Sequence, residues 1–64
     1  MKIQASSLRE LNKVIETLIE VVPNKYRKLR DICLLANGEV ADGKSETNEV
    51  EFAISEIKHL LEEK

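Results

Sequence analysis

The chain has 64 residues, a net charge of −2 and a charged fraction of 34%. That length allows one domain, here residues 1–64, and a monomer this small is marginally stable unless regular helix packing or self-association supports it. The many Ile, Leu and Val residues argue against disorder, and the acidic balance makes a nucleic-acid binder less favoured.

The cysteine and histidine content excludes two common stabilising devices. Cys33 is the single cysteine, so no intramolecular disulfide can form, and Cys33 with His59 cannot supply the four ligands of a structural zinc. No apolar run approaches the ~18 residues that span a membrane, and the first seven residues lack the apolar core of a signal peptide. We therefore expect a cytoplasmic protein without a cofactor.

Residues 7–22 have the pattern of an amphipathic helix, and residues 1–6 before them are expected to form a flexible arm. Ser7 and Glu10 have the spacing of a capping box. Spacings of three and four residues place one apolar face on Leu8, Leu11, Ile15, Leu18 and Val22. Ile19 and Val21 widen that face. Pro23 ends the helix, because proline clashes with the preceding turn.

A second helix is predicted over residues 24–37, very close to the first, so the two should form a hairpin or a sharp corner. Its buried face consists of Tyr26, Leu29, Cys33 and Ala36. Leu34 falls on the other side, and this makes the last turns apolar nearly all round. Gly38 is predicted to end this helix, because glycine accepts the left-handed conformation common at that position.

The third predicted helix covers residues 46–62 and begins after several polar residues suited to capping, such as Ser45. Its buried face consists of Val50, Ala53, Ile54, Ile57, Leu60 and Leu61. The expected fold is all-α, a helical hairpin plus a third helix. Its apolar surface is larger than three helices can cover, so we expect a homodimer to complete it.

The polar segment NGEVADGKSETNE, residues 37–49, has partial likeness to two ligand-binding motifs. Neither EF-hand register supplies the required ligands, since one puts Lys44 at the third position and the other begins on Val40. The string GEVADGKS, residues 38–45, fits the P-loop pattern letter for letter, but a P-loop follows a buried strand in a parallel sheet. Nucleotide or metal binding at residues 38–45 is therefore a minor alternative, and a simple connector is favoured.

The stretch ADGKSETNEVE, residues 41–51, resembles the acidic turn before a helix in tellurite-resistance TerB-like helical bundles. The resemblance covers this short stretch alone and lacks a second acidic turn. It implies a helical bundle, and no function is carried over from it.

Four cations lie within six residues at the start of the second predicted helix: Lys25, Arg27, Lys28 and Arg30. Cations at a helix N-terminus oppose the helix dipole, so an anionic partner is one interpretation of this cluster. Pairing with the acidic residues between positions 39 and 56, within the chain or between subunits, is the favoured one. Nucleic-acid binding through the cluster stays an alternative function.

A small, non-catalytic protein-interaction or regulatory module is the favoured function. Phe52 lies about 160° from Val50 on the third helix and is predicted to be exposed, as interface aromatics are. The interface candidates are Phe52, Leu34, Ile19, Val21 and His59. Catalysis is not expected, because Cys33 lies on an apolar face and His59 faces solvent.

Overall fold

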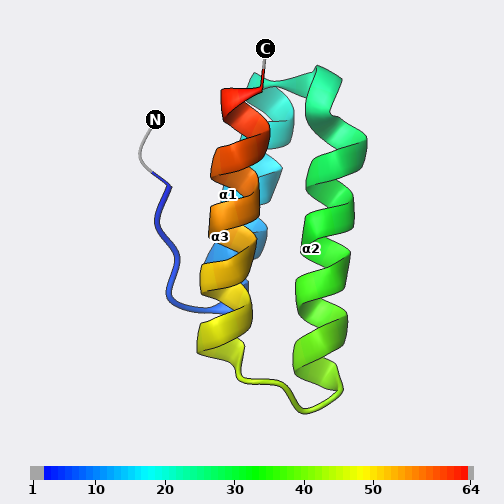
Figure 1. The fold of residues 1–64 in the computed structure, drawn as a ribbon. Coiled ribbons are helices and arrows are strands. Elements are labelled where there is room, and N and C mark those ends of the chain that lie inside the picture. Colours follow the sequence, from blue (N-terminus) through cyan, green and yellow to red (C-terminus); the bar gives the residue numbers. More distant parts are fainter. Residues whose placement is uncertain (1–2, 64) are drawn as a thin grey trace.

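The computed structural model describes residues 3–63 and contains three α-helices (Figure 1). They are α1 (Leu8–Val21), α2 (Tyr26–Ala41) and α3 (Glu46–Glu62), with a short 3-10 turn, η1 (Pro23–Lys25), between the first two. The described residues contain no strand. The predicted all-helical fold of a hairpin plus a third helix is confirmed, whereas homodimerisation stays a prediction.

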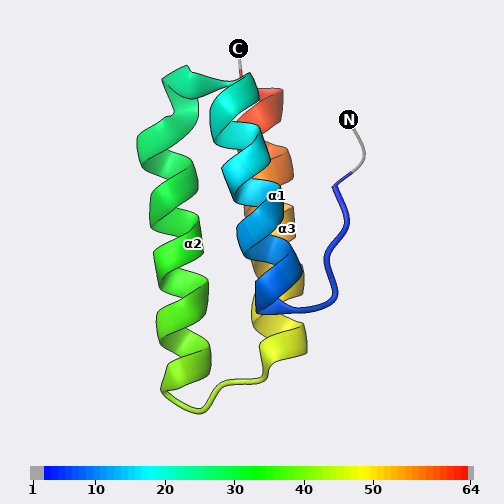
Figure 2. The same ribbon diagram turned by 180° about the vertical axis from the view of Figure 1, so that it is seen from behind.

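The helices lie side by side, with α2 running opposite to α1 and α3 (Figures 1 and 2). Figure 2 shows α1 in front of α3 and α2 beside them, so the three form a triangle around one core. The short link through η1 makes α1 and α2 an antiparallel hairpin. As α2 is antiparallel to both neighbours, its first turn lies near the last turn of α3.

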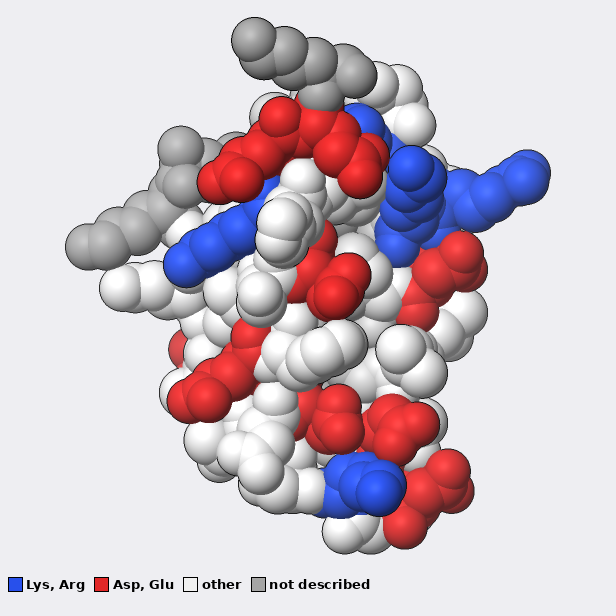
Figure 3. Space-filling view, in the orientation of Figure 1, with Lys and Arg blue, Asp and Glu red and all other residues white. Residues whose placement is uncertain are grey.

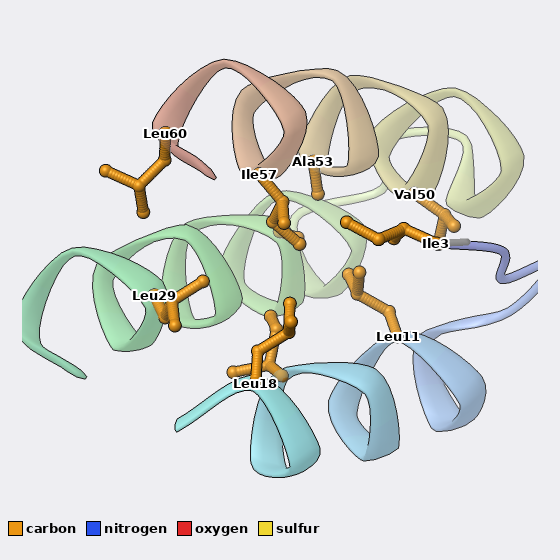
Figure 4. Packing of buried hydrophobic residues seen from close by; sticks show 10 residues of the cluster. Ile3, Leu11, Leu18, Leu29, Val50, Ala53, Ile57 and Leu60 are labelled. Carbon is orange, nitrogen blue, oxygen red and sulfur yellow. The ribbon is translucent and has the colours of Figure 1, made fainter. Parts of the chain in front are cut away.

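The apolar faces predicted from helical spacing point into this core (Figure 4). The buried residues of α1 and α3 are three or four positions apart, and those of α2 are seven apart, so each set lies on one side of its helix. The buried hydrophobic residues are Ile3, Leu11, Ile15, Leu18, Leu29, Ala36, Val50, Ala53, Ile57 and Leu60. The prediction that Tyr26 is buried is wrong, because its side chain is 51% exposed. It is the first residue of α2, at the end of the bundle, where little surrounds its ring.

The predicted arm before α1 is described from Ile3 onward and is not helical. It runs beside the helices in both ribbon views, and Ile3 retains only 8% of its exposed surface. Residues 1–2 lie outside the described part of the chain. The flexibility predicted for residues 1–6 stays a prediction, but the burial of Ile3 ties this segment to the core.

The start of α1 is capped by two side chains, one of them from α3. Ser7 Oγ accepts a hydrogen bond from the Glu10 amide at 3.3 Å, as a capping box requires. The Glu10 carboxylate does not return to Ser7; it accepts from Ser6 Oγ at 2.6 Å. Glu46 accepts instead from the next amide, that of Leu8, at 2.8 Å, so it links the first turns of α1 and α3.

The predicted bounds of the second helix, 24–37, are wrong at both ends. Residues 23–25 form η1, and α2 continues through Gly38 to Ala41. The glycine that ends it is Gly43, with a φ of 100°. The Lys44 amide donates to the Glu39 carbonyl and the Gly43 amide to the Val40 carbonyl, both at 3.0 Å, which is the Schellman pattern.

Candidate functional site

An apolar groove lies between α2 and α3. It encloses about 310 Å³. Its lining residues are Asp31, Ile32, Leu35, Ala36, Glu49, Phe52, Ala53 and Glu56. Phe52 and Leu35 are 56% and 57% exposed, one on each side of the groove. The groove thus joins two large, exposed apolar side chains from different helices, which makes it a candidate binding surface.

Helical spacing brings these residues to one place. On α3, Glu49, Phe52, Ala53 and Glu56 follow one another at steps of three, one and three, which is a single stripe on a helix. This stripe lies next to the stripe of core residues. Ala53 belongs to both, since it is buried and also forms part of the groove floor. The groove is therefore built on two rigid helices and does not depend on a loop.

Two further hollows extend the groove along both helices. The hollow toward the Asp42–Ser45 turn shares Leu35, Glu49 and Phe52 with it. The hollow toward the C-terminal end of α3 shares Asp31, Ile32 and Glu56. The three hollows make one continuous trough from Glu39 to Lys28.

The rim of the trough carries carboxylates on both helices. Asp31 and Glu39 belong to α2, and Glu49 and Glu56 belong to α3. Figure 3 shows this side of the molecule, where acidic side chains flank an uncharged strip and most basic side chains lie toward the upper end. The trough is thus apolar along its floor and negatively charged along its rim.

The sequence-predicted interface residues do not form one surface. Phe52 lines the central groove, and His59 lines the hollow at its upper end. Val21 lines a separate hollow beside Ile3, and Ile19 packs against the core. Leu34 is 62% exposed and lies one residue away from the groove-lining Leu35. Their roles in an interface stay predictions.

Leu35 is the groove residue that the sequence-based candidates omit. It flanks the predicted buried face of the second helix, so helical spacing alone does not distinguish it from a core residue. The signal that could have identified it is the stripe Asp31, Leu35 and Glu39, in which one leucine stands between two acids at steps of four residues.

Two of the four predicted basic residues, Lys25 and Lys28, pair with Glu63, the residue that follows α3. Lys25 Nζ and Lys28 Nζ lie 3.7 Å and 3.6 Å from Glu63 Oε2. Among residues 3–63, neither lysine pairs with the acidic residues at positions 39–56 that were predicted as its partners. The antiparallel course of α2 places its first turn far from most of those acids.

The string at residues 38–45 forms the end of one helix and the start of the next. Gly38 lies within α2, and the Glu39 and Val40 carbonyls accept the Schellman hydrogen bonds. Ser45 Oγ accepts a hydrogen bond from the Asn48 amide at 3.4 Å and caps α3. Over residues 3–63, no three Cys, His, Asp or Glu side chains are grouped closely enough to hold a metal ion.

Cys33 belongs to a polar cluster between α1 and α2. Its Sγ donates to Asn12 Oδ1 at 3.0 Å, and Asn37 Nδ2 donates to the same oxygen at 3.1 Å. Burial raises the pKa of the Cys33 thiol above its ordinary value, so the protonated and less nucleophilic form is favoured. His59 lies instead in the trough between α2 and α3.

No protein-family model, curated protein or solved structure matches this chain. In the part of the chain that the structure describes, no helix combines the length and the apolar character that a membrane crossing needs.

Proposed function

We propose that this chain is a small, non-catalytic protein-interaction module that docks another polypeptide in the groove between α2 and α3. The observation that carries this proposal is the pair Phe52 and Leu35, each more than half exposed, on opposite sides of one apolar hollow. Exposed apolar surface is stabilised by about 25 cal/mol per Å² when a partner covers it. Aromatic residues surrounded by a closed rim are typical centres of such interfaces.

Nucleic-acid binding through Lys25, Arg27, Lys28 and Arg30 is a weaker proposal. Two of these cations share Glu63, and the neighbouring trough has an acidic rim that would repel a phosphate backbone. If the cluster nevertheless binds DNA, added salt should weaken the complex steeply. No binding at low salt would remove this alternative.

The test of docking is a photocrosslinking experiment on the full chain. Phe52 is replaced by a benzophenone amino acid in one variant and the exposed Glu51 of the same helix in another, and each is irradiated in the cells that make the protein. We expect covalent protein adducts from position 52 and few from position 51, since Glu51 does not line the groove. Equal adducts from both positions, or none from position 52, contradict the proposal.

The mass of the adduct identifies the kind of partner. An adduct of twice the chain mass indicates self-association, the predicted homodimer, whereas any other mass indicates a different protein. Leu35→Ser provides a second check, because it removes the opposite side of the groove without touching the crosslinker. It should reduce adduct formation at position 52 if the groove is the docking site.

A further inference from the structure

We propose that the polypeptide that occupies the trough between α2 and α3 is an amphipathic helix whose apolar stripe is flanked by lysine or arginine residues. The inference rests on the docking function above and names the chemistry of the partner. The floor of the trough, the helices that form it and the charges on its rim each restrict what can bind.

The shape of the trough suits a helix. It runs along α2 from Lys28 to Glu39, a distance of about 16 Å at 1.5 Å per residue, or about three helical turns. A partner helix in the groove between the antiparallel helices α2 and α3 would pack as helices do in a helical bundle. An extended peptide binds best to an open sheet edge, and the described residues contain no strand to offer one.

The floor of the trough requires an apolar stripe on the partner. Ile32, Leu35 and Ala36 come from α2, and Phe52 and Ala53 come from α3. A helix with apolar residues at i, i+3, i+4 and i+7 presents a stripe of matching width. Polar side chains at those positions would lose hydration without finding partners on this floor.

The rim of the trough determines the charge beside that stripe. Asp31 and Glu39 stand on one side and Glu49 and Glu56 on the other, so a docked helix has carboxylates along both flanks. Lys28 is the one lysine or arginine among the residues that line the three hollows, and it lies within 3.6 Å of Glu63. Cations on the partner would be attracted and anions repelled, which favours specificity and rapid association.

A second copy of the chain is a poorer occupant of this trough. A two-fold dimer places the same surface on both sides of the interface. The rim carboxylates of one copy would then lie against those of the other around the Phe52 side chains, and facing like charges are unfavourable. The predicted homodimer, if it forms, is better served by a different surface.

The test uses two synthetic helical peptides of about 15 residues with the same leucine and phenylalanine stripe. One carries lysine at the flanking positions and the other glutamate. Each is titrated into the isotope-labelled full chain at low salt while the backbone amide resonances are followed. We expect the lysine peptide to shift the amides of residues 31–36 and 49–56 and to bind at least about tenfold more tightly than the glutamate peptide.

Matched charge variants identify the source of that preference. Glu49→Gln/Glu56→Gln removes two rim carboxylates, and Glu51→Gln/Glu62→Gln removes two exposed carboxylates of α3 outside the trough. The first variant should reduce the preference for the lysine peptide to less than about threefold, and the second should leave it nearly unchanged. Each variant's amide spectrum verifies its fold.

The possible failures are distinguishable. Equal binding of both peptides at the trough overturns the basic partner and leaves the docking function in place. Shifts outside the trough, or no shifts with either peptide, overturn the inference. Trough resonances that move with protein concentration alone identify a second copy as the occupant and also overturn it.

Discussion

Asn12 holds the polar contact between α1 and α2 through a single side-chain oxygen. That oxygen accepts hydrogen bonds from Cys33 Sγ and Asn37 Nδ2. We expect Asn12→Ala to lower the free energy of unfolding by about 1–2 kcal/mol, because two partly buried donors lose their shared acceptor. Urea denaturation measures this. Lys13→Ala is the control, an exposed neighbour, and an equal effect of the two changes would contradict the role of Asn12.

Cys33 should make the protein less stable at alkaline pH. Burial raises the pKa of its thiol above the ordinary value of 9.0, as does Glu16 more weakly, while Arg30 and the Asn37 hydrogen bond lower it. Because the thiol pKa is higher in the folded state, the contribution of the thiol to the free energy of unfolding is complete below the unfolded-state pKa. That contribution is lost as pH rises through the folded-state pKa.

We therefore expect the free energy of unfolding to fall more steeply above the ordinary thiol pKa of 9.0 in the natural chain than in Cys33→Ala. Urea denaturation at several pH values measures the two slopes, and every other side chain is common to the two proteins. Parallel slopes would mean that the thiol titrates alike in the folded and unfolded chain.

At the scale of the helix, the two glycines after the predicted buried face of α2 have opposite roles. Gly38 lies inside α2, with open space where a Cβ would stand, whereas Gly43 has a φ of 100°. We expect Gly38→Ala to stabilise the protein by about 0.5–1 kcal/mol, because alanine is the better helix former. Gly43→Ala should destabilise it by about 1–2 kcal/mol, since a Cβ disfavours left-handed angles.

Thermal and urea denaturation of the two variants measure these effects. Each variant is the control for the other, because both substitutions add the same methyl group. Destabilisation by Gly38→Ala would indicate that α2 ends at Gly38 in solution, as the sequence alone predicts.

The two glycines also show where sequence reasoning is limited. The apolar spacing of the three helices predicts their number, order and core faces, because burial follows helical periodicity. Asn37-Gly38 and Asp42-Gly43 carry the same kind of local stop signal, and the sequence does not distinguish them. In the structure α2 continues past Gly38 and ends at the second signal. There the Lys44 and Gly43 amides form the two hydrogen bonds of the Schellman motif.

At the scale of the whole molecule, the trough could be predicted only in part. Phe52 is identified by its position outside the apolar register of α3, a property of one helix. The exposure of Leu35 cannot be predicted without knowing which helices are neighbours, because it depends on whether another element covers that side of α2. The pairing of Lys25 and Lys28 with Glu63 likewise follows from topology, which local sequence does not encode.

Ile3 packs into the core although it precedes the three helices. Its substitution therefore tests whether the segment before α1 is part of the folded domain. Its side chain belongs to the buried cluster, while its neighbour Gln4 is exposed. We expect Ile3→Ala to lower the free energy of unfolding by about 1–2 kcal/mol, below the range of an Ile→Ala change in a helix-enclosed core because a terminal segment can readjust. Urea denaturation measures the change, with Gln4→Ala as the matched control. If residues 1–6 are a flexible arm in solution, the two variants should be equally stable; a clear difference means that the arm is part of the folded domain.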